Sequence, residues 1–147
     1  MIPDREYSIS IIGLGKLGKA LASQLYGCTS VRGWDVVDTG LTIQTDTLYD
    51  CIKGTDTIFI VVPSTHFQES LDNIIKAYSY NKDWHTATKV NVITFTKGIC
   101  NNELPIDIIK SRLPSNPCGV ISGPMLSEEL YNRSTKAVLA SNNMDIH

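Results

Sequence analysis

The sequence lacks a strong excess of charge of either sign. Its 13 lysine and arginine residues are scattered along the chain and stand against 15 acidic residues, which gives a net charge of -2. A nucleic-acid-binding protein typically gathers its basic residues into a patch or stripe. We therefore expect no nucleic-acid partner and no binding to an acidic membrane surface.

Long apolar segments are also missing. The longest purely apolar run, at 58–62, is far shorter than the roughly 20 residues that a membrane-spanning helix needs. The first six residues contain no apolar stretch of the kind found in a signal peptide. We therefore expect a cytoplasmic protein without a membrane segment.

The cysteines give no sign of disulfides or of a metal site. They lie far apart, form no C-x-x-C pair and have no histidine at zinc-ligand spacing; they are Cys28, Cys51, Cys100 and Cys118. We expect free thiols in a reducing compartment and no bound metal. None of the three histidines stands beside a serine or cysteine in a recognisable nucleophile motif, so we assign none a catalytic role.

The sequence does contain the pattern of an α/β domain. Its 147 residues, 42% of them hydrophobic and 19% charged, have the size and composition of one globular domain. Short apolar runs bounded by glycine, proline, asparagine and serine alternate with segments of helical period, which is typical of βαβ units. No internal repeat or linker divides the chain. We therefore predict a single Rossmann-like domain over residues 1–147, doubly wound, with a mainly parallel sheet.

Periodicity also predicts where the elements lie. Strands are expected at 9–12, 31–36, 57–62, 90–94, 120–122 and 136–140. Helices are expected at 17–25, 67–78, 105–113 and 124–130. The first two helices each carry one apolar stripe at helical spacing. In the third, we expect Ile106, Ile109 and Leu113 to face inward.

A glycine-rich turn follows the first predicted strand. Three glycines fit the pattern G-x-G-x-x-G between a strand and a helix, the setting in which this pattern predicts dinucleotide binding. The first permits the tight turn, the second lets backbone N–H groups approach a pyrophosphate, and the third lets the helix pack against the strand. The helix start adds free N–H donors and a partial positive charge. The predicted cofactor-binding residues here are Gly13, Leu14, Gly15, Lys16, Leu17 and Gly18.

The same segment nearly matches the phosphate loop of nucleoside triphosphatases. Lys19 stands in the place of that loop's lysine, but Ala20 stands where a serine or threonine hydroxyl must bind magnesium. No strand ending in a metal-binding aspartate follows at a suitable distance. We therefore do not predict ATP or GTP hydrolysis.

Asp35 comes at the end of the second predicted strand, about 20 residues after the glycine-rich turn. A carboxylate there can accept hydrogen bonds from the adenosine ribose. It also repels a 2′-phosphate, so it favours NAD over NADP. The alternative interpretation is a turn residue at a strand end, because Asp38 follows closely.

Two further strand ends carry candidate residues. Pro63 ends the strand at 57–62, next to the crevice where open parallel sheets bind ligands. Phe67 is either a cofactor contact or the first core residue of its helix, and periodicity favours the core. Lys97 follows the strand at 90–94, where a cation can hold a phosphate or polarise a carbonyl oxygen. From the residue type alone, a solvated surface lysine is the alternative.

The segment 122–129 repeats this arrangement. A strand end is followed by Gly123, by Pro124 and by a predicted helix start aimed at the same crevice. Taken alone, the segment is equally compatible with a plain strand-to-helix connection.

The order of these blocks resembles the N-terminal domain of NAD-dependent glycerol-3-phosphate dehydrogenases. The matching blocks are 13–18, Val62-Pro63-Ser64 with Phe67, 96–99, and 122–124 followed by Glu128, Glu129 and 137–141. That family transfers a hydride between NADH and dihydroxyacetone phosphate, giving sn-glycerol 3-phosphate. The resemblance therefore implies an oxidoreductase domain with NAD as its cofactor and a small phosphate-bearing substrate.

The resemblance also implies roles for individual residues. It places Lys97 beside the nicotinamide and the substrate, Phe67 at the border of the cofactor, and Ser127 where a helix start approaches the cofactor. Pro63 and Gly123 lie in matching blocks. We accordingly predict Pro63, Phe67, Lys97 and Ser127 as cofactor contacts, and Lys97 and Gly123 as substrate contacts.

Three features depart from the family pattern. Met125 replaces a residue that is commonly polar or small, and a thioether cannot donate a hydrogen bond to a substrate. Asp35 is not the family's usual residue and is more typical of prephenate dehydrogenases. The family's general-acid lysine and its phosphate-gripping residues belong to a C-terminal helical domain that has no counterpart in this chain.

Positioning and proton transfer supply several orders of magnitude of rate. We therefore expect NAD binding by these 147 residues with little or no turnover. The alternatives are a stand-alone NAD-binding module that senses redox state without catalysis, and a dehydrogenase of a hydroxy acid or of prephenate. A homodimer is also compatible with the sequence.

Overall fold

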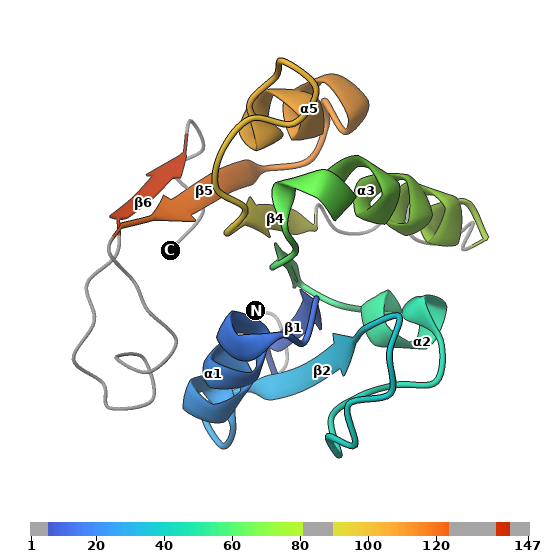
Figure 1. The fold of residues 1–147 in the computed structure, drawn as a ribbon. Helices are drawn as coiled ribbons and strands as arrows, with labels where there is room; N and C mark the ends of the chain where they lie inside the picture. Colours follow the sequence, from blue (N-terminus) through green and yellow to red (C-terminus); the bar gives the residue numbers. More distant parts are fainter. Residues whose placement is uncertain (1–5, 81–89, 124–137, 142–147) are drawn as a thin grey trace.

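The computed structural model describes residues 6–80, 90–123 and 138–141, which form a six-stranded sheet with helices on both faces (Figure 1). The strands are β1 (Ser8–Ile12), β2 (Ser30–Trp34), β3 (Thr57–Ile60), β4 (Asn91–Thr94), β5 (Cys118–Ser122) and β6 (Val138–Ser141). The helices are α1 (Lys16–Leu25), α2 (Leu48–Ile52), α3 (Ser64–Ser79) and α5 (Pro105–Arg112).

The sheet has the strand order β2-β1-β3-β4-β5-β6. Strands β1 to β5 pair in parallel, and β6 pairs antiparallel with β5. The chain runs from β1 outward to β2 and then crosses to β3 on the other side of β1, so the topological switch point lies between β1 and β3. This arrangement confirms the predicted Rossmann-like α/β fold with a mainly parallel sheet.

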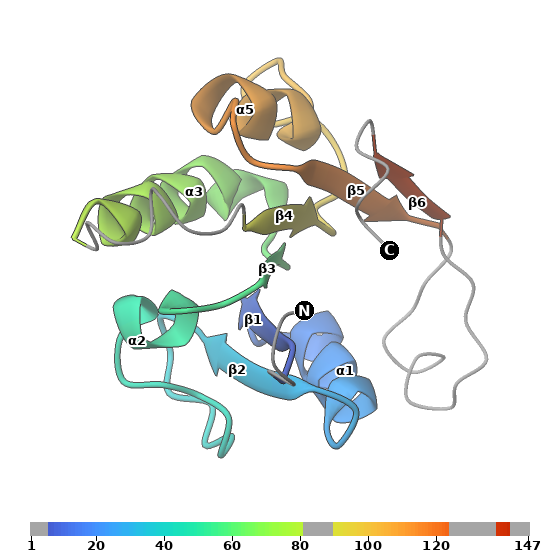
Figure 2. The ribbon, with the colours of Figure 1, turned by 180° about the vertical axis from the view of Figure 1, so that it is seen from behind.

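Each face of the sheet carries its own apolar core. On one face, Leu21 and Ala22 of α1 pack with the apolar side chains of β1 and β4. On the other face, α2, α3 and α5 pack against β1, β3 and β4. Figures 1 and 2, which are opposite views, show α1 on one side of the sheet and these three helices on the other. Helices on both faces make the sheet doubly wound, as predicted.

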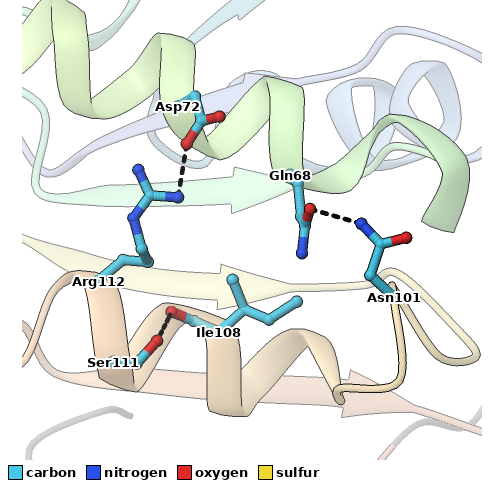
Figure 3. Close-up of polar contacts among 6 residues, drawn as sticks. All are labelled: Gln68, Asp72, Asn101, Ile108, Ser111 and Arg112. Atoms are coloured by element: carbon cyan, nitrogen blue, oxygen red, sulfur yellow. Dashed lines mark hydrogen bonds and ion pairs between the residues drawn. The ribbon is translucent and has the colours of Figure 1, made fainter.

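Polar side chains connect α3 with α5 and with the loop before it (Figure 3). Arg112 Nη1 lies 2.5 Å from Asp72 Oδ1, and Asn101 Nδ2 donates a hydrogen bond to Gln68 Oε1 at 2.7 Å. An exposed ion pair of this kind contributes at most about 1 kcal/mol. The buried apolar residues between the two helices therefore stabilise this layer more than the pair does.

Two stretches differ from the sequence-based expectation. β2 ends at Trp34, and Val36, which we expected within this strand, is 83% exposed. Helix α2 was not expected, because its five residues cover little more than one helical turn and show no periodicity. The helix predicted at 124–130 lies outside the described residues.

The inner face of α5 is also shifted from the predicted one. Ile108 and Ile109 are buried, whereas Ile106 and Leu113 are only partly buried at the edge of the same core. None of the helices in the described part of the chain combines the length and the apolar character that crossing a membrane requires.

The cysteines are free thiols, of which only Cys28 is exposed. Cys51 lies in α2 with no exposed surface, and its carbonyl oxygen accepts a 2.5 Å hydrogen bond from the Ser10 hydroxyl. Burial raises the pKa of the Cys51 thiol from 9.0 to about 11. Burial also raises the pKa of the Cys100 and Cys118 thiols.

Candidate functional site

The predicted site residues that the structure describes gather at the carboxyl ends of the parallel strands. Ile12 of β1 pairs in register with Ile60 of β3, and Ile60 pairs with Thr94 of β4. Because these strand ends are aligned, the segments that follow them leave the sheet along the same edge. This edge, at the switch point, is where open α/β sheets bind ligands.

The turn after β1 is held between the ends of β2 and β3. The N–H of Gly13 donates a 3.0 Å hydrogen bond to the carbonyl oxygen of Trp34, the last residue of β2. On the other side, a Cβ atom added to Gly13 would stand 2.2 Å from the carbonyl oxygen of Val61. Gly13 also has φ +102°, a conformation that favours glycine. No other residue fits here, which agrees with the tight-turn role predicted for the first glycine.

The other two glycines of the turn have different surroundings. A Cβ atom on Gly18 would stand 1.9 Å from the carbonyl oxygen of Gly13, so helix α1 approaches the turn as closely as glycine allows. A Cβ atom on Gly15 would meet no heavy atom within 4 Å. Gly18 therefore serves helix packing, whereas Gly15 borders open space. The placement of Gly18 agrees with its predicted packing role, and the pyrophosphate-binding role of Gly15 stays a prediction.

Helix α1 begins directly after Gly15, and no side chain caps it. Its first backbone N–H groups have no acceptor within the helix. Its first turn contains no acidic residue but does contain the exposed Lys16 and Lys19. The two ammonium groups add to the partial positive charge of the helix N-terminus, so the first turn of α1 carries positive charge. It is suited to an anionic ligand.

Asp35, the first residue after β2, contacts the glycine-rich turn. Its Oδ2 accepts a 2.7 Å hydrogen bond from the N–H of Leu14, and its Oδ1 accepts a 3.1 Å hydrogen bond from the N–H of Val37. The carboxylate is half-buried. Its negative charge therefore lies beside the turn that leads into α1, at the end of β2 where the sequence predicted it.

The ends of β3, β4 and β5 are also connected by side chains. The Thr96 hydroxyl donates a 2.7 Å hydrogen bond to the carbonyl oxygen of Val62. Lys97 Nζ donates a 3.1 Å hydrogen bond to the carbonyl oxygen of Gly123. The two residues predicted as substrate contacts are therefore neighbours. The exposed Lys97 ammonium lies at the carboxyl edge of the sheet, and a lysine there offers donors to an oxyanion.

A segment that we did not assign from the sequence lies beside β2. Gly33 N–H donates to the carbonyl oxygen of Ile43, and Thr45 N–H donates to that of Gly33, both at 2.9 Å, so 43–45 adds a short parallel bridge to the sheet edge. Gln44 fixes the loop between, because its Nε2 donates to the carbonyl oxygen of Val37 at 2.8 Å. A glutamine in a polar loop carries no sequence signal for such a role.

Of the remaining predicted cofactor contacts, one is exposed and two are buried. Pro63 is exposed and immediately precedes α3. Phe67 has no exposed surface and packs in the core with Leu71 and Ile74, which agrees with the core role that periodicity favours. The Leu14 side chain is also buried. Contact of Phe67 and Leu14 with a cofactor stays a prediction, and their packing does not favour it.

The predicted contact Ser127 and the family departure Met125 lie outside the described residues. The helix start that the sequence predicts at Pro124 is also outside, so the part of this block that the structure describes ends with Gly123 and its contact with Lys97.

A parallel sheet with a three-glycine turn at its switch point and an electropositive helix start defines a dinucleotide-binding domain of the Rossmann type. The family model for the N-terminus of NAD-dependent glycerol-3-phosphate dehydrogenase matches residues 35–147. This chain belongs to that family. The resemblance found in the sequence is thereby confirmed at the level of the family.

Relatives and solved structures agree with this assignment. The chain is 35% identical over 125 residues to a glycerol-3-phosphate dehydrogenase [NAD(P)+] of Rickettsia typhi, and 34% identical to that of Rickettsia prowazekii, covering 83% of this chain in both. It is similar to the glycerol-3-phosphate dehydrogenase structure from Coxiella burnetii, with a TM-score of 0.78 and 26% identity over 94% of this chain. The Plasmodium falciparum enzyme has a TM-score of 0.73 at 18% identity over 97% of the chain, which shows the shared fold alone.

The chain spans only part of these proteins. It covers 37% of each Rickettsia relative, 47% of the Coxiella chain and 48% of the Plasmodium chain. What is established for this chain is therefore its homology to the NAD-binding N-terminal part of the family.

Proposed function

We propose that this chain binds NAD(H) at the turn 13–18 and forms the cofactor-binding part of an enzyme that reduces dihydroxyacetone phosphate to sn-glycerol 3-phosphate. The observation that carries the proposal is the turn itself. Gly13 and Gly18 are glycine because backbone atoms leave no room for a Cβ, whereas Gly15 is glycine beside open space. A glycine that nothing in the described structure requires is explained by a ligand that needs its backbone uncovered.

The residues around Gly15 fit a pyrophosphate. The first N–H groups of α1 lack acceptors within the helix and can donate to phosphate oxygens. The exposed Lys16 adds a positive charge at the same end. These groups would bind and orient the cofactor's diphosphate.

At the adenosine end we assign Asp35 to the ribose and infer a preference for NAD over NADP. Its carboxylate has about four acceptor sites and uses two for Leu14 and Val37, which leaves capacity for ribose hydroxyls. A 2′-phosphate there would meet a negative charge. The names of the two Rickettsia relatives include NAD(P)+. The preference for NAD over NADP is therefore proposed for this chain and is not taken from those names.

At the other end of the site we assign Lys97 to the substrate. Bound NADH would supply a hydride to the substrate carbonyl carbon. The Lys97 ammonium, held toward β5 by the Gly123 carbonyl oxygen, would donate to an oxygen of the substrate. A fixed cation of this kind stabilises the negative charge that develops on a carbonyl oxygen during reduction.

We further propose that the 147 residues alone bind NADH with little or no turnover. The proton donor and the phosphate-binding residues that the family resemblance implies belong to the part of the relatives that this chain does not match, since it covers 37% of each. Residues of the described edge would position a cofactor and one substrate oxygen, and this alone is insufficient for efficient proton transfer.

A fluorescence titration tests cofactor binding directly. Trp34 ends β2 beside Asp35, and its carbonyl oxygen accepts the N–H of Gly13, so a bound nicotinamide dinucleotide would lie within range for energy transfer from its indole. The chain has two tryptophans, and Trp84→Phe leaves Trp34 as the sole donor. We expect saturable transfer from Trp34 to NADH. A folded protein that shows no saturable signal and no calorimetric binding would refute the proposal.

A further inference from the structure

Asp35 makes a contact that a ribose-binding residue does not require. Its Oδ2 accepts the N–H of Leu14 at 2.7 Å, across the gap between the end of β2 and the turn after β1. Its Oδ1 accepts the N–H of Val37 at 3.1 Å, which fixes the carboxylate on its own loop. One side chain thus joins two segments that are separated in sequence by the whole of α1.

This contact acts together with a backbone bond one residue earlier. Gly13 N–H donates to Trp34 O at 3.0 Å, so two consecutive N–H groups of the turn are bound by two consecutive residues at the end of β2. The N–H groups that follow, from Gly15 into α1, are the ones left for a ligand. The direction in which they point depends on the plane of the peptides that precede them.

We propose that Asp35 is a positioning residue, which holds the turn 13–15 in its ligand-binding conformation before the cofactor binds. This inference rests on the proposed cofactor site and gives Asp35 a role that is separate from any contact with the ribose. A charged acceptor suits the role, because hydrogen bonds to charged groups are stronger than those between neutral groups. Preorganisation of this kind increases affinity by reducing the ordering that binding requires.

Two substitutions separate the acceptor from the charge. Asp35→Asn removes the charge but keeps an oxygen that can accept the N–H of Leu14. Asp35→Ala removes both. If Asp35 acted only on the cofactor, by binding the ribose hydroxyls or by repelling a 2′-phosphate, neither variant would change the exchange rate of the Leu14 amide without cofactor. The positioning role predicts faster exchange of that amide in Asp35→Ala, together with an NADH affinity about tenfold below the parent's, whereas the affinity of Asp35→Asn stays within about threefold of the parent.

Asp38 provides a matched control in the same loop. Its Oδ1 accepts the N–H of Gly40 at 2.9 Å, so it is also an acid that bonds a backbone group two residues later. No hydrogen bond joins it to the glycine-rich turn within the described residues. Asp38→Ala should leave NADH affinity within about twofold of the parent.

The experiment combines calorimetric titration with NADH and NADPH and hydrogen exchange of the Leu14 amide without cofactor. We expect the Leu14 amide to exchange at least about tenfold faster in Asp35→Ala, at an intermediate rate in Asp35→Asn, whose neutral acceptor is weaker, and at nearly the parent rate in Asp38→Ala. Equal NADH affinity of Asp35→Ala and Asp35→Asn, or unchanged exchange in Asp35→Ala, would overturn the positioning role. A parent that binds no NADH would refute the proposed function and is recognised before any variant is compared.

Discussion

Gly18 lies so close to Gly13 that a Cβ atom added to Gly18 would stand 1.9 Å from the Gly13 carbonyl oxygen and 2.9 Å from its carbonyl carbon. Helix α1 therefore meets the turn after β1 backbone to backbone. A hydrogen bond from the N–H of Gly13 to the carbonyl oxygen of Trp34 also connects this turn to the end of β2. Displacing α1 would thus disturb the whole switch-point edge of the sheet.

Gly18→Ala should destabilise the protein although alanine is the better helix former. The added methyl group meets backbone atoms, which cannot rotate away, so α1 or the turn has to move. Overpacking of this kind typically costs about 1–3 kcal/mol, and the gain in helix propensity of about 1 kcal/mol offsets part of it. Because the methyl group would clash with backbone at 1.9 Å, the overpacking cost should lie in the upper part of this range, about 2–3 kcal/mol. We therefore expect a net loss of roughly 1–2 kcal/mol in the free energy of unfolding by urea, together with weaker NADH binding. A variant as stable as the parent would contradict the close packing.

Gly15→Val should abolish NADH binding while leaving the stability of the protein nearly unchanged. A side chain at Gly15 meets no heavy atom within 4 Å, and the backbone of Gly15 is extended at φ -71° and ψ -162°, which valine adopts easily. Valine is a poor residue before a helix, so we expect a loss of at most about 1 kcal/mol of stability. Calorimetry should detect no NADH binding, because the branched side chain fills the approach to the first N–H groups of α1. Equal NADH affinity of this variant and the parent would show that the cofactor site has been assigned wrongly.

The glycine-rich turn and the mainly parallel α/β fold could be predicted from sequence because both leave local patterns. Three glycines between an apolar run and a helical stripe identify the turn and its neighbours without knowledge of distant contacts. The short helix α2 leaves no such local pattern. Helix α2 has five residues and is capped by Thr47, whose hydroxyl oxygen accepts the N–H of Asp50 at 3.0 Å. A single turn of helix is too short for an apolar period to appear.

The contacts of the site could not be predicted, because they join strands that are neighbours only in the fold. The bond between Asp35 and Leu14 requires β1 and β2 to be adjacent and parallel, with Ile12 opposite Trp34. Val36 was predicted within β2 because valine favours strands and the residue follows directly on the segment 31–35. After Trp34 the backbone leaves the sheet, because the Gln44 side chain bonds the carbonyl oxygen of Val37 in the loop, and Val36 is exposed.

Thiol reactivity should distinguish Cys28 from the other cysteines. Cys28 is exposed, whereas Cys51, Cys100 and Cys118 are buried and burial raises the pKa of each of these three thiols. The thiolate is the reactive form, so buried thiols with raised pKa react slowly. With an aromatic disulfide reagent at pH 8, we expect one of the four thiols to react rapidly and the rest only after unfolding. Cys28→Ser should remove the fast phase, and a fast phase that survives this substitution would contradict the burial of the others.

The buried Cys51 thiol should also make stability depend on pH in the alkaline range. Burial raises its pKa from 9.0 in an exposed state to about 11 in the folded protein. Below about pH 9 the thiol is protonated in both states, so its contribution to stability is fully present. Between about pH 9 and 11 the unfolded state loses its proton first, and the contribution is lost as the pH rises through the folded pKa.

A comparison of the parent with Cys51→Ala isolates this effect from the other groups that titrate at high pH, including Tyr78, whose pKa burial also raises. The alanine variant should be less stable at pH 8, because it leaves a cavity in the core between the sheet and helices α2, α3 and α5. From pH 8 to pH 11, however, the parent should lose roughly 2–3 kcal/mol more unfolding free energy than the variant. Urea denaturation of both proteins at the two pH values measures the difference. Parallel losses in parent and variant would mean that the Cys51 thiol ionises equally in the folded and unfolded states, and hence that water reaches it in the folded protein.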